Sequence, residues 1–274
     1  MIKIYSFASN RPDFIGLQLH SFKKHLKDPF EFIVFNNAQY DSTGGADYQG
    51  LHNAGKENGI QVIDIQKDQD LINRCQVLEP SCSLFSHHHG TYSNANVAHA
   101  YAFNWAWENY MLKEKGPIAI FDSDVFLIQP ISLIEVLGQH QICCIQDGKP
   151  HPDGRAFHYM WPTFVVINMA TLPDPQTLNW WCGRIEDVPV DVGGQSHWYF
   201  KSHPDLDVYY VKRLNSYYLN IEDQVPFSPS NYDEFYPAGI TVLHYRSGSD
   251  WDHKGIEYHA KKTEWLKKRI NEGQ

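Results

Sequence analysis

The 274-residue chain has little of what several protein classes require. Its 23 Lys and Arg stand against 32 Asp and Glu, a formal charge of −9. This shortage of cations argues against nucleic-acid binding, in which Lys and Arg displace counterions from phosphates. No apolar stretch approaches the roughly 18 residues of a membrane-spanning helix. There is no Pro/Gly/Ser linker, internal repeat or low-complexity tract, so we expect a soluble globular protein without a nucleic-acid partner or transmembrane segment.

Cysteine is also scarce, with five residues: Cys75, Cys82, Cys143, Cys144 and Cys182. The count is odd, no C-x-x-C spacing occurs, and the adjacent pair lies inside an apolar run, a pattern typical of reduced and mostly buried thiols. The first residues, Met1 to Phe7, have the pattern of a strand and not that of a basic segment before a signal core. We therefore expect a cytoplasmic protein in a reducing compartment.

What the chain does have is an alternation of strand-like and helix-like segments. Expected strands cover Ile2–Phe7, Phe30–Phe35, Ile60–Ile65, Ile118–Phe121, Gln141–Ile145, Thr163–Asn168, Val208–Val211 and Ile240–His244. Expected helices cover Asp13–His25, Ser93–Leu112, Gln176–Cys182 and Gly255–Arg269, and a loop covers Tyr40–Gly50. Short apolar runs bounded by turns fit strands buried on both faces. The pattern predicts one α/β domain.

The most informative segment runs from Ile118 to Val125, where an apolar strand leads directly into Asp122, Ser123 and Asp124. Side chains alternate along an extended segment, so the two aspartates should point the same way and Ser123 the opposite way. Ligands gather beyond the carboxyl ends of strands in open α/β sheets. A pair of carboxylates there suits Mn²⁺ or Mg²⁺. The alternative is a solvated turn, because Asp and Ser are common turn residues.

A second strand, Ile240–His244, ends in a histidine and is followed by a turn with Gly248 and then by Trp251. An imidazole that joins two carboxylates makes an oxygen/oxygen/nitrogen set, which shifts the preference from Mg²⁺ towards Mn²⁺. By itself His244 could be an ordinary strand-end histidine. Together with Asp122 and Asp124 it is the third candidate metal ligand.

These features resemble a nucleotide-sugar-dependent glycosyltransferase of the GT-A fold. The resemblance covers most of the chain: the first strand, the second strand ended by asparagines, the Ser93–Leu112 helix, the aspartate motif and the His244–Trp251 segment. It implies a Rossmann-like domain with a central mixed sheet flanked by helices, a nucleotide-sugar-binding half over about 1–130 and an acceptor-side half over about 131–274. It also implies a metal that bridges the donor diphosphate.

The last segment is similar to the His-x-x-Gly-x-x-(Lys-Pro-)Trp motif of the retaining family that includes glycogenin and bacterial galactosyltransferases. Here one extra residue separates His244 from Gly248, and Lys-Pro is missing before Trp251. Lys254 and Arg246 are possible substitutes for the phosphate-binding lysine. The stereochemical outcome is open, and the segment favours retention.

The resemblance also suggests residues for the two substrates. The expected donor contacts are Ser9, Arg11, Asn37, Asn96, His99, Asp122 and Ser123. Asp191 is the candidate catalytic residue, as a general base or as a group that stabilises the sugar; a helix cap is its alternative role. Trp161, Trp198 and Trp251 could stack on sugar rings, although aromatic residues are more often core. Asp147, Asp153 and Glu222 are lesser candidates.

The predicted function is transfer of a sugar from a nucleotide donor, UDP-sugar preferred and GDP-sugar possible, to a glycan or glycoconjugate hydroxyl, with Mn²⁺ or Mg²⁺. Two alternatives are a phosphohydrolase of the haloacid dehalogenase type and a non-catalytic carbohydrate-binding protein on the same fold.

The run His87–His89 fits a loop better than a metal site, since consecutive side chains diverge. The Lys-rich C-terminal end is a solvated helix face or, alternatively, a site of weak peripheral contact with an anionic membrane.

Overall fold

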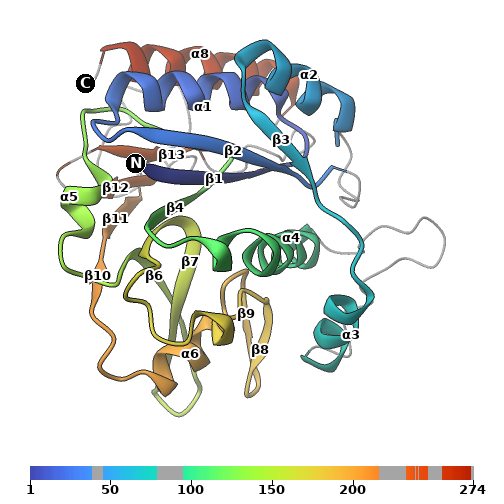
Figure 1. The fold of residues 1–274 in the computed structure, drawn as a ribbon, viewed down its shortest axis with the longest axis vertical. Helices are drawn as coiled ribbons and strands as arrows, with labels where there is room; N and C mark the ends of the chain where they lie inside the picture. The colour runs from blue at the N-terminus through green and yellow to red at the C-terminus, as the bar shows by residue number, and fades with distance from the viewer. Residues whose placement is uncertain are drawn as a thin grey trace.

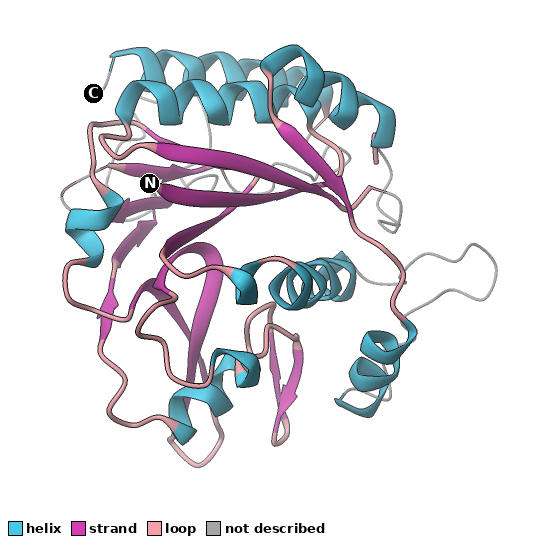
Figure 2. Cartoon of the chain, viewed as in Figure 1, coloured by secondary structure: helices cyan, strands magenta, loops and turns pink. Residues whose placement is uncertain are grey.

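The structure is a computed structural model that describes residues 1–38, 46–78, 95–215, 233–237, 239, 241–245 and 255–272 (Figures 1 and 2). The helices are α1 (Pro12–His25), α2 (Tyr48–Asn58), α3 (Gln69–Leu78), α4 (Ala95–Asn109), α5 (Leu133–Leu137), α6 (Ser196–Ser202) and α8 (Ile256–Glu272), with 3₁₀ turns at Met111–Lys113 and Pro175–Thr177. The strands are β1 (Ile2–Ala8), β2 (Phe30–Asn36), β3 (Gln61–Asp64), β4 (Pro117–Asp122), β5 (Val125–Leu127), β6 (Ile142–Pro150), β7 (Ala156–Asn168), β8 (Gly183–Ile185), β9 (Val188–Val190), β10 (Val208–Tyr210), β11 (Lys212–Asn215), β12 (Asp233–Tyr236) and β13 (Val242–His244).

A seven-stranded mixed sheet forms the centre, in the order β10-β6-β7-β4-β1-β2-β3. Strand β7 is antiparallel to both of its neighbours, and the other pairs in this sheet are parallel. A smaller antiparallel sheet has the order β11-β12-β13-β5, and β8 and β9 form a hairpin. The predicted central mixed sheet flanked by helices is confirmed.

Both faces of the central sheet are covered, as the apolar strands predict. Along β1 the side chains alternate: Ile2 and Ile4 pack with α1 and α2, whereas Tyr5 and Phe7 pack with α4. Figure 1 shows α1 and α2 on one side of the sheet and α4 on the other. Helix α8 lies beside α1 and contributes Leu266 to a separate apolar cluster. Strands buried on both faces leave only their ends available for chemistry.

Strands β6 and β7 continue beyond the rest of the sheet. Residues 156–161 of β7 pair with β6, whereas β4 pairs only with residues 164–168. Because β6 runs parallel to β4, this extension projects from the same edge at which β4 ends in Asp122. It therefore stands next to the edge where the sequence predicts the site.

The predicted helix over Gln176–Cys182 is wrong. The structure has a single 3₁₀ turn there and no α-helix, because the amides of Trp180 and Trp181 donate to the side-chain oxygens of Asn104 and Asn179 and not to carbonyls one helical turn earlier. Helix α2 begins inside the predicted Tyr40–Gly50 loop. Its N-cap Asp47 accepts from the amide of Gly50 at 2.8 Å, a local signal that the sequence already contained.

The other predicted strands and helices are confirmed with shifted ends. No predicted helix or strand covers α2, α3, α5, α6, β5, β8, β9, β11 or β12. The proposed N-cap Ser93 lies outside the described residues.

Cys143, Cys144 and Cys182 are free and buried. Among the described residues, no helix has the length and apolar character needed to cross a bilayer.

Candidate active site

The Asp-Ser-Asp segment forms a tight turn between β4 and β5, and a side chain of helix α1 bonds to its backbone. The side-chain amide of Gln18 donates to the carbonyls of Asp122 and Val125, each at 2.9 Å. Gln18 is 1% exposed. One buried amide therefore satisfies two carbonyls that flank Asp124, which fixes the backbone of the turn.

Two other elements bring side chains next to Asp122. The hydroxyl of Thr163 donates to Asp122 Oδ2 at 2.9 Å, and His99 Nε2 on α4 lies 3.2 Å from Asp122 Oδ1. Thr163 reaches this position because β7 bulges: its register on β6 jumps from Val165 to Trp161 while β6 advances by one residue. A bulge at the sheet edge is a common way to redirect a side chain into a site.

Asp124 faces His244 from the smaller sheet. Strands β5 and β13 are antiparallel with Val125 opposite His244, and His244 Nε2 lies 3.4 Å from Asp124 Oδ1. The other ring nitrogen, Nδ1, lies 3.3 Å from Asp233 Oδ2. Burial lowers the pKa of His244, but the two carboxylates outweigh it and raise the pKa to about 9. Without a metal, His244 is an imidazolium between two aspartates at neutral pH.

The three predicted metal ligands lie at one edge of the fold, but their side chains are not arranged as a three-ligand metal site. Across the described ranges, no group of three or more His, Cys, Asp or Glu side chains is arranged to hold a metal ion. Asp124 and His244 form one pair, and Asp122 and His99 form another. Donors at right angles on an ion with bonds of about 2.1–2.3 Å are about 3.0–3.3 Å apart, so the 3.4 Å pair of Asp124 and His244 fits adjacent positions on one ion.

Of the predicted donor contacts, Asn37 has the most distinctive environment. It directly follows β2, its amide bonds to the carbonyl of Ala8 at the end of β1, and its side chain is 6% exposed. Its buried Oδ1 accepts no hydrogen bond from any residue that the structure describes. Ser9 follows β1, where its carbonyl accepts from Asp47, and Ser123 is half-buried in the turn. Asn96 is exposed at the start of α4.

Arg11, another predicted donor contact, is buried and hydrogen-bonded within the protein. It is 2% exposed, and its guanidinium makes two bonds to Asp13, at 2.8 and 2.6 Å, and one to Thr263 on α8 at 3.2 Å. The same group stacks 3.5 Å from the ring centre of Phe14. These contacts tie α1 to α8 and occupy the guanidinium.

Asp191 lies in a turn that packs closely against β7. Its Oδ1 accepts from the amide of Val192 at 2.8 Å, and the amide of Met160 donates to the hydroxyl of Ser196 at 2.9 Å. Gly193 has a φ of +84°, and a Cβ added there would lie 2.1 Å from the Met160 carbonyl oxygen. The turn therefore depends on glycine, both for its backbone angle and for its close approach to β7.

The predicted stacking residues differ in exposure. Trp161, on the β7 extension, is half-buried and meets the His244 ring edge-on, with ring centres 5.2 Å apart. Trp198 on α6 is 41% exposed, with the ammonium group of Lys201 4.9 Å from its ring centre. Trp251, Gly248, Arg246 and Lys254 lie outside the described residues, as do the His87–His89 run and Glu222.

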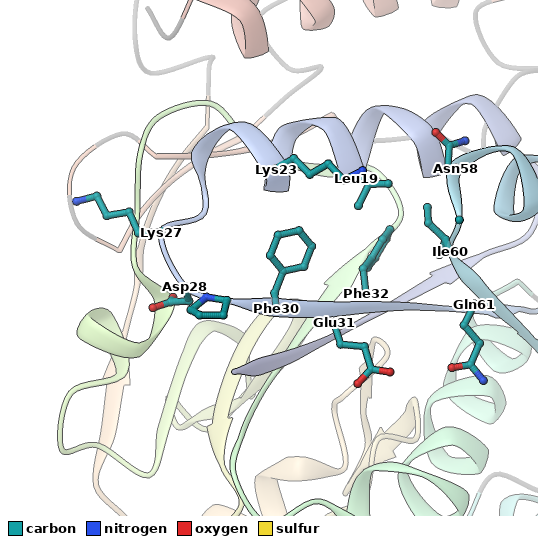
Figure 3. A pocket seen from close by; sticks show the side chains of 12 residues that line it. Leu19, Lys23, Lys27, Asp28, Phe30, Glu31, Phe32, Asn58, Ile60 and Gln61 are labelled. Atoms are coloured by element: carbon teal, nitrogen blue, oxygen red, sulfur yellow. The ribbon is translucent and has the colours of Figure 1, made fainter.

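A hollow of about 780 Å³ lies at the opposite end of the strands (Figure 3). It is lined by α1, by the first residues of β2 such as Phe30, and by Ile60 and Gln61 before and at the start of β3. None of the predicted site residues lines it. Its position at the amino ends of the strands separates it from the Asp122–His244 edge.

The mixed sheet order, the aspartate turn at the end of β4 and the antiparallel strand carrying His244 together define a GT-A fold. An active-site mutant of LgtC superimposes with a TM-score of 0.50 at 12% identity, over 99% of this chain and 95% of that one. Galactosyltransferase LgtC in complex with donor and acceptor sugar analogs gives 0.49 at 12% identity, with the same coverage. Glycosyltransferase GlyE of Streptococcus pneumoniae gives 0.41 at 14%, over 98% of this chain and 64% of that one.

No protein-family model matches the sequence, and no curated protein matches it. At 12% identity the likeness shows a shared fold. The activity of this chain must therefore be argued from its own site.

Sequence reasoning missed three residues that support the site: Gln18, Thr163 and Asp233. Gln18 and Thr163 lie 104 and 41 residues from Asp122, and Asp233 lies 11 residues before His244 on the neighbouring strand. No local pattern marks such a partner, because the contact exists only when the elements pack together. Thr163 had one indirect signal, the proline before it in an otherwise strand-like run.

Proposed function

We propose that this chain is a metal-dependent glycosyltransferase that moves a sugar from a nucleotide donor, preferably a UDP-sugar, to a glycan or glycoconjugate hydroxyl. The observation that supports this most directly is the 3.4 Å pair of Asp124 and His244 at the carboxyl edge of β4, in a fold shared with glycosyltransferases. A carboxylate and an imidazole offer Mn²⁺ an oxygen and a nitrogen ligand.

The ion in this proposal is shared with the donor. Divalent ions at phosphate-transfer sites commonly take one or two protein ligands, with substrate phosphates and water completing the coordination. Asp124 and His244 supply the protein ligands, and Asp122 contacts either the ion or the donor. When bound, the ion neutralises the charge that grows on the departing diphosphate. The pKa of about 9 means that His244 must release a proton before it can coordinate the ion.

The chain's own residues position the side chains that would contact the donor and the ion. A hydrogen bond from Thr163 fixes the Asp122 carboxylate, whose other oxygen lies 3.2 Å from His99 Nε2, and Gln18 fixes the turn that carries Asp124. Asp191, on its glycine-dependent turn, is the candidate that stabilises the oxocarbenium-like sugar or activates the acceptor hydroxyl. The two roles correspond to retention and inversion, and the His244 segment favours retention.

The proposal is tested with a panel of UDP- and GDP-sugars, each incubated with and without Mn²⁺. The preferred donor at a hundred times its Kd should stabilise the protein by about 2.7 kcal/mol. It should do so only with Mn²⁺, and it should be slowly hydrolysed or transferred. The measurements are thermal unfolding and release of nucleoside diphosphate, with EDTA as the control. A chain that no donor stabilises, with or without metal, would refute the proposal.

Asn37→Leu separates donor binding from folding. The buried Oδ1 of Asn37 accepts no hydrogen bond from the described part of the chain, and a nucleobase N–H is a suitable donor for it. The substitution should weaken nucleotide binding about tenfold, the equivalent of about 1.4 kcal/mol. Because an unsatisfied buried acceptor is removed, the free energy of unfolding should stay the same or rise by up to about 1 kcal/mol. Calorimetry and urea unfolding measure the two quantities; unchanged nucleotide affinity would remove Asn37 from the proposed site.

A further inference from the structure

We propose that Asp233 is a positioning residue of the metal site, whose carboxylate sets the orientation and tautomer of the His244 imidazole so that Nε2 faces Asp124. This inference rests on the proposed function, because it treats His244 as a metal ligand. Asp233 was not among the residues that the sequence suggested. It comes from β12, which the fold places against the histidine strand.

The pairing of β12 with β13 brings the two residues together. The strands are antiparallel, and Asp233 stands directly opposite His244 in the register. Directly opposed residues on an antiparallel pair have side chains about 5 Å apart, close enough for a direct contact. Asp233 Oδ2 lies 3.3 Å from His244 Nδ1, and Asp233 is 1% exposed. The register therefore fixes the contact, and burial shields it from water.

The two nitrogens of His244 have different partners. Nδ1 faces Asp233, and Nε2 faces Asp124 at 3.4 Å. A neutral imidazole carries one N–H and one lone pair. Because an ionised carboxylate can only accept, Asp233 keeps the proton on Nδ1 and leaves the lone pair of Nε2 for the ion. Carboxylates commonly hold metal-binding histidines in this way.

Packing alone would not achieve this. Trp161 meets the imidazole edge-on at 5.2 Å between ring centres, and Phe235 lies roughly parallel to it at 6.0 Å. These rings restrict the plane of the imidazole. They do not distinguish its nitrogens, since neither ring edge accepts a hydrogen bond from Nδ1. The choice between the two nitrogens therefore falls to Asp233.

The next residue provides a matched control. Glu234 is also a buried carboxylate on β12, 3% exposed, but its Oε1 lies 3.4 Å from the Arg269 guanidinium on α8. A loss caused by general damage to β12 would appear on changing either residue. A loss caused by the imidazole contact would appear only on changing Asp233.

The test is the affinity for Mn²⁺, measured by electron paramagnetic resonance with saturating UDP and, in parallel, with GDP. Asp233→Ala should lower Mn²⁺ affinity about 10- to 100-fold. Asp233→Asn, which keeps an oxygen that can accept from Nδ1, should recover most of it. Glu234→Gln should stay within about threefold of the wild-type value. Asp233→Leu is measured alongside in case the alanine variant unfolds. It also removes both carboxylate oxygens, and its larger side chain leaves no cavity.

The outcomes separate the two proposals. If the wild-type protein binds Mn²⁺ and both Asp233→Ala and Asp233→Leu bind it equally well, Asp233 has no positioning role while the proposed function stands. If Glu234→Gln loses as much affinity as Asp233→Ala, the effect belongs to β12 as a whole and the inference is overturned. If the wild-type protein binds no Mn²⁺ with either nucleotide, the metal-dependent function fails, and the role of Asp233 fails with it.

Discussion

Replacing Asp124 with asparagine should abolish sugar transfer, with a loss in kcat/KM of at least ~10³-fold, equivalent to about 4 kcal/mol of transition-state stabilisation. The substitution keeps the shape of the side chain and removes its charge. The ion then loses its carboxylate ligand beside His244, which lies 3.4 Å from Asp124. Activity with the preferred donor and Mn²⁺ affinity are the two measurements, and both should fall together.

Asp205→Asn is the control for this prediction, because Asp205 is exposed and precedes β10, at the amino end of a strand that runs parallel to β6. It should leave transfer unchanged. A thermal unfolding curve for Asp124→Asn near that of the wild type would show that the loss is chemical. Full activity of Asp124→Asn would disprove its role as a metal ligand.

Gly193→Ala should destabilise the protein by at least about 3 kcal/mol. The new Cβ would lie 2.1 Å from the Met160 carbonyl oxygen and 3.0 Å from Pro162 Cδ, at a backbone φ of +84°. Neither the β7 backbone nor the proline ring can move away easily, since β7 is paired within the central sheet. In a chain of this size the melting temperature should fall by at least about 6 °C.

Gly154→Ala separates the two causes of that loss. Gly154 has a similar φ of +90°, but nothing lies within 4 Å of the Cβ that would be added. It should therefore cost only the backbone strain, about 1 kcal/mol. Equal losses for the two variants, measured by denaturant unfolding, would mean that the turn at Gly193 moves away from β7 without difficulty.

The parts of the site that could be predicted from sequence are those that lie within one short segment. Asp122 and Asp124 follow a buried strand, so their position at a sheet edge required only the pattern of apolar residues and the geometry of a strand. The pairing of Asp124 with His244 needed more than a local pattern. It was suggested by resemblance, and the β5–β13 pairing places the two side chains next to each other.

The predicted helix that is absent depends on distant contacts. The segment Gln176–Cys182 has helix-like spacing, yet the amide of Trp180 donates to the side-chain oxygen of Asn104, which lies 76 residues away. A contact from another element therefore replaces a hydrogen bond that a helix would need. Arg11 stays a predicted donor contact, and its guanidinium bonds to Asp13 and Thr263.

The sequence by itself determined the fold class, the positions along the chain of the central-sheet strands and the place of the aspartate turn, because these follow from local periodicity and strand geometry. Only the tertiary structure decided which side chains support the site. Gln18 bonds to the backbone of the turn, Thr163 bonds to Asp122, and Asp233 contacts His244. These contacts join elements that pack together only in the folded chain, and their directions depend on sheet register and on one bulge in β7. A one-residue change in either register would turn the supporting side chain to the other face of its sheet.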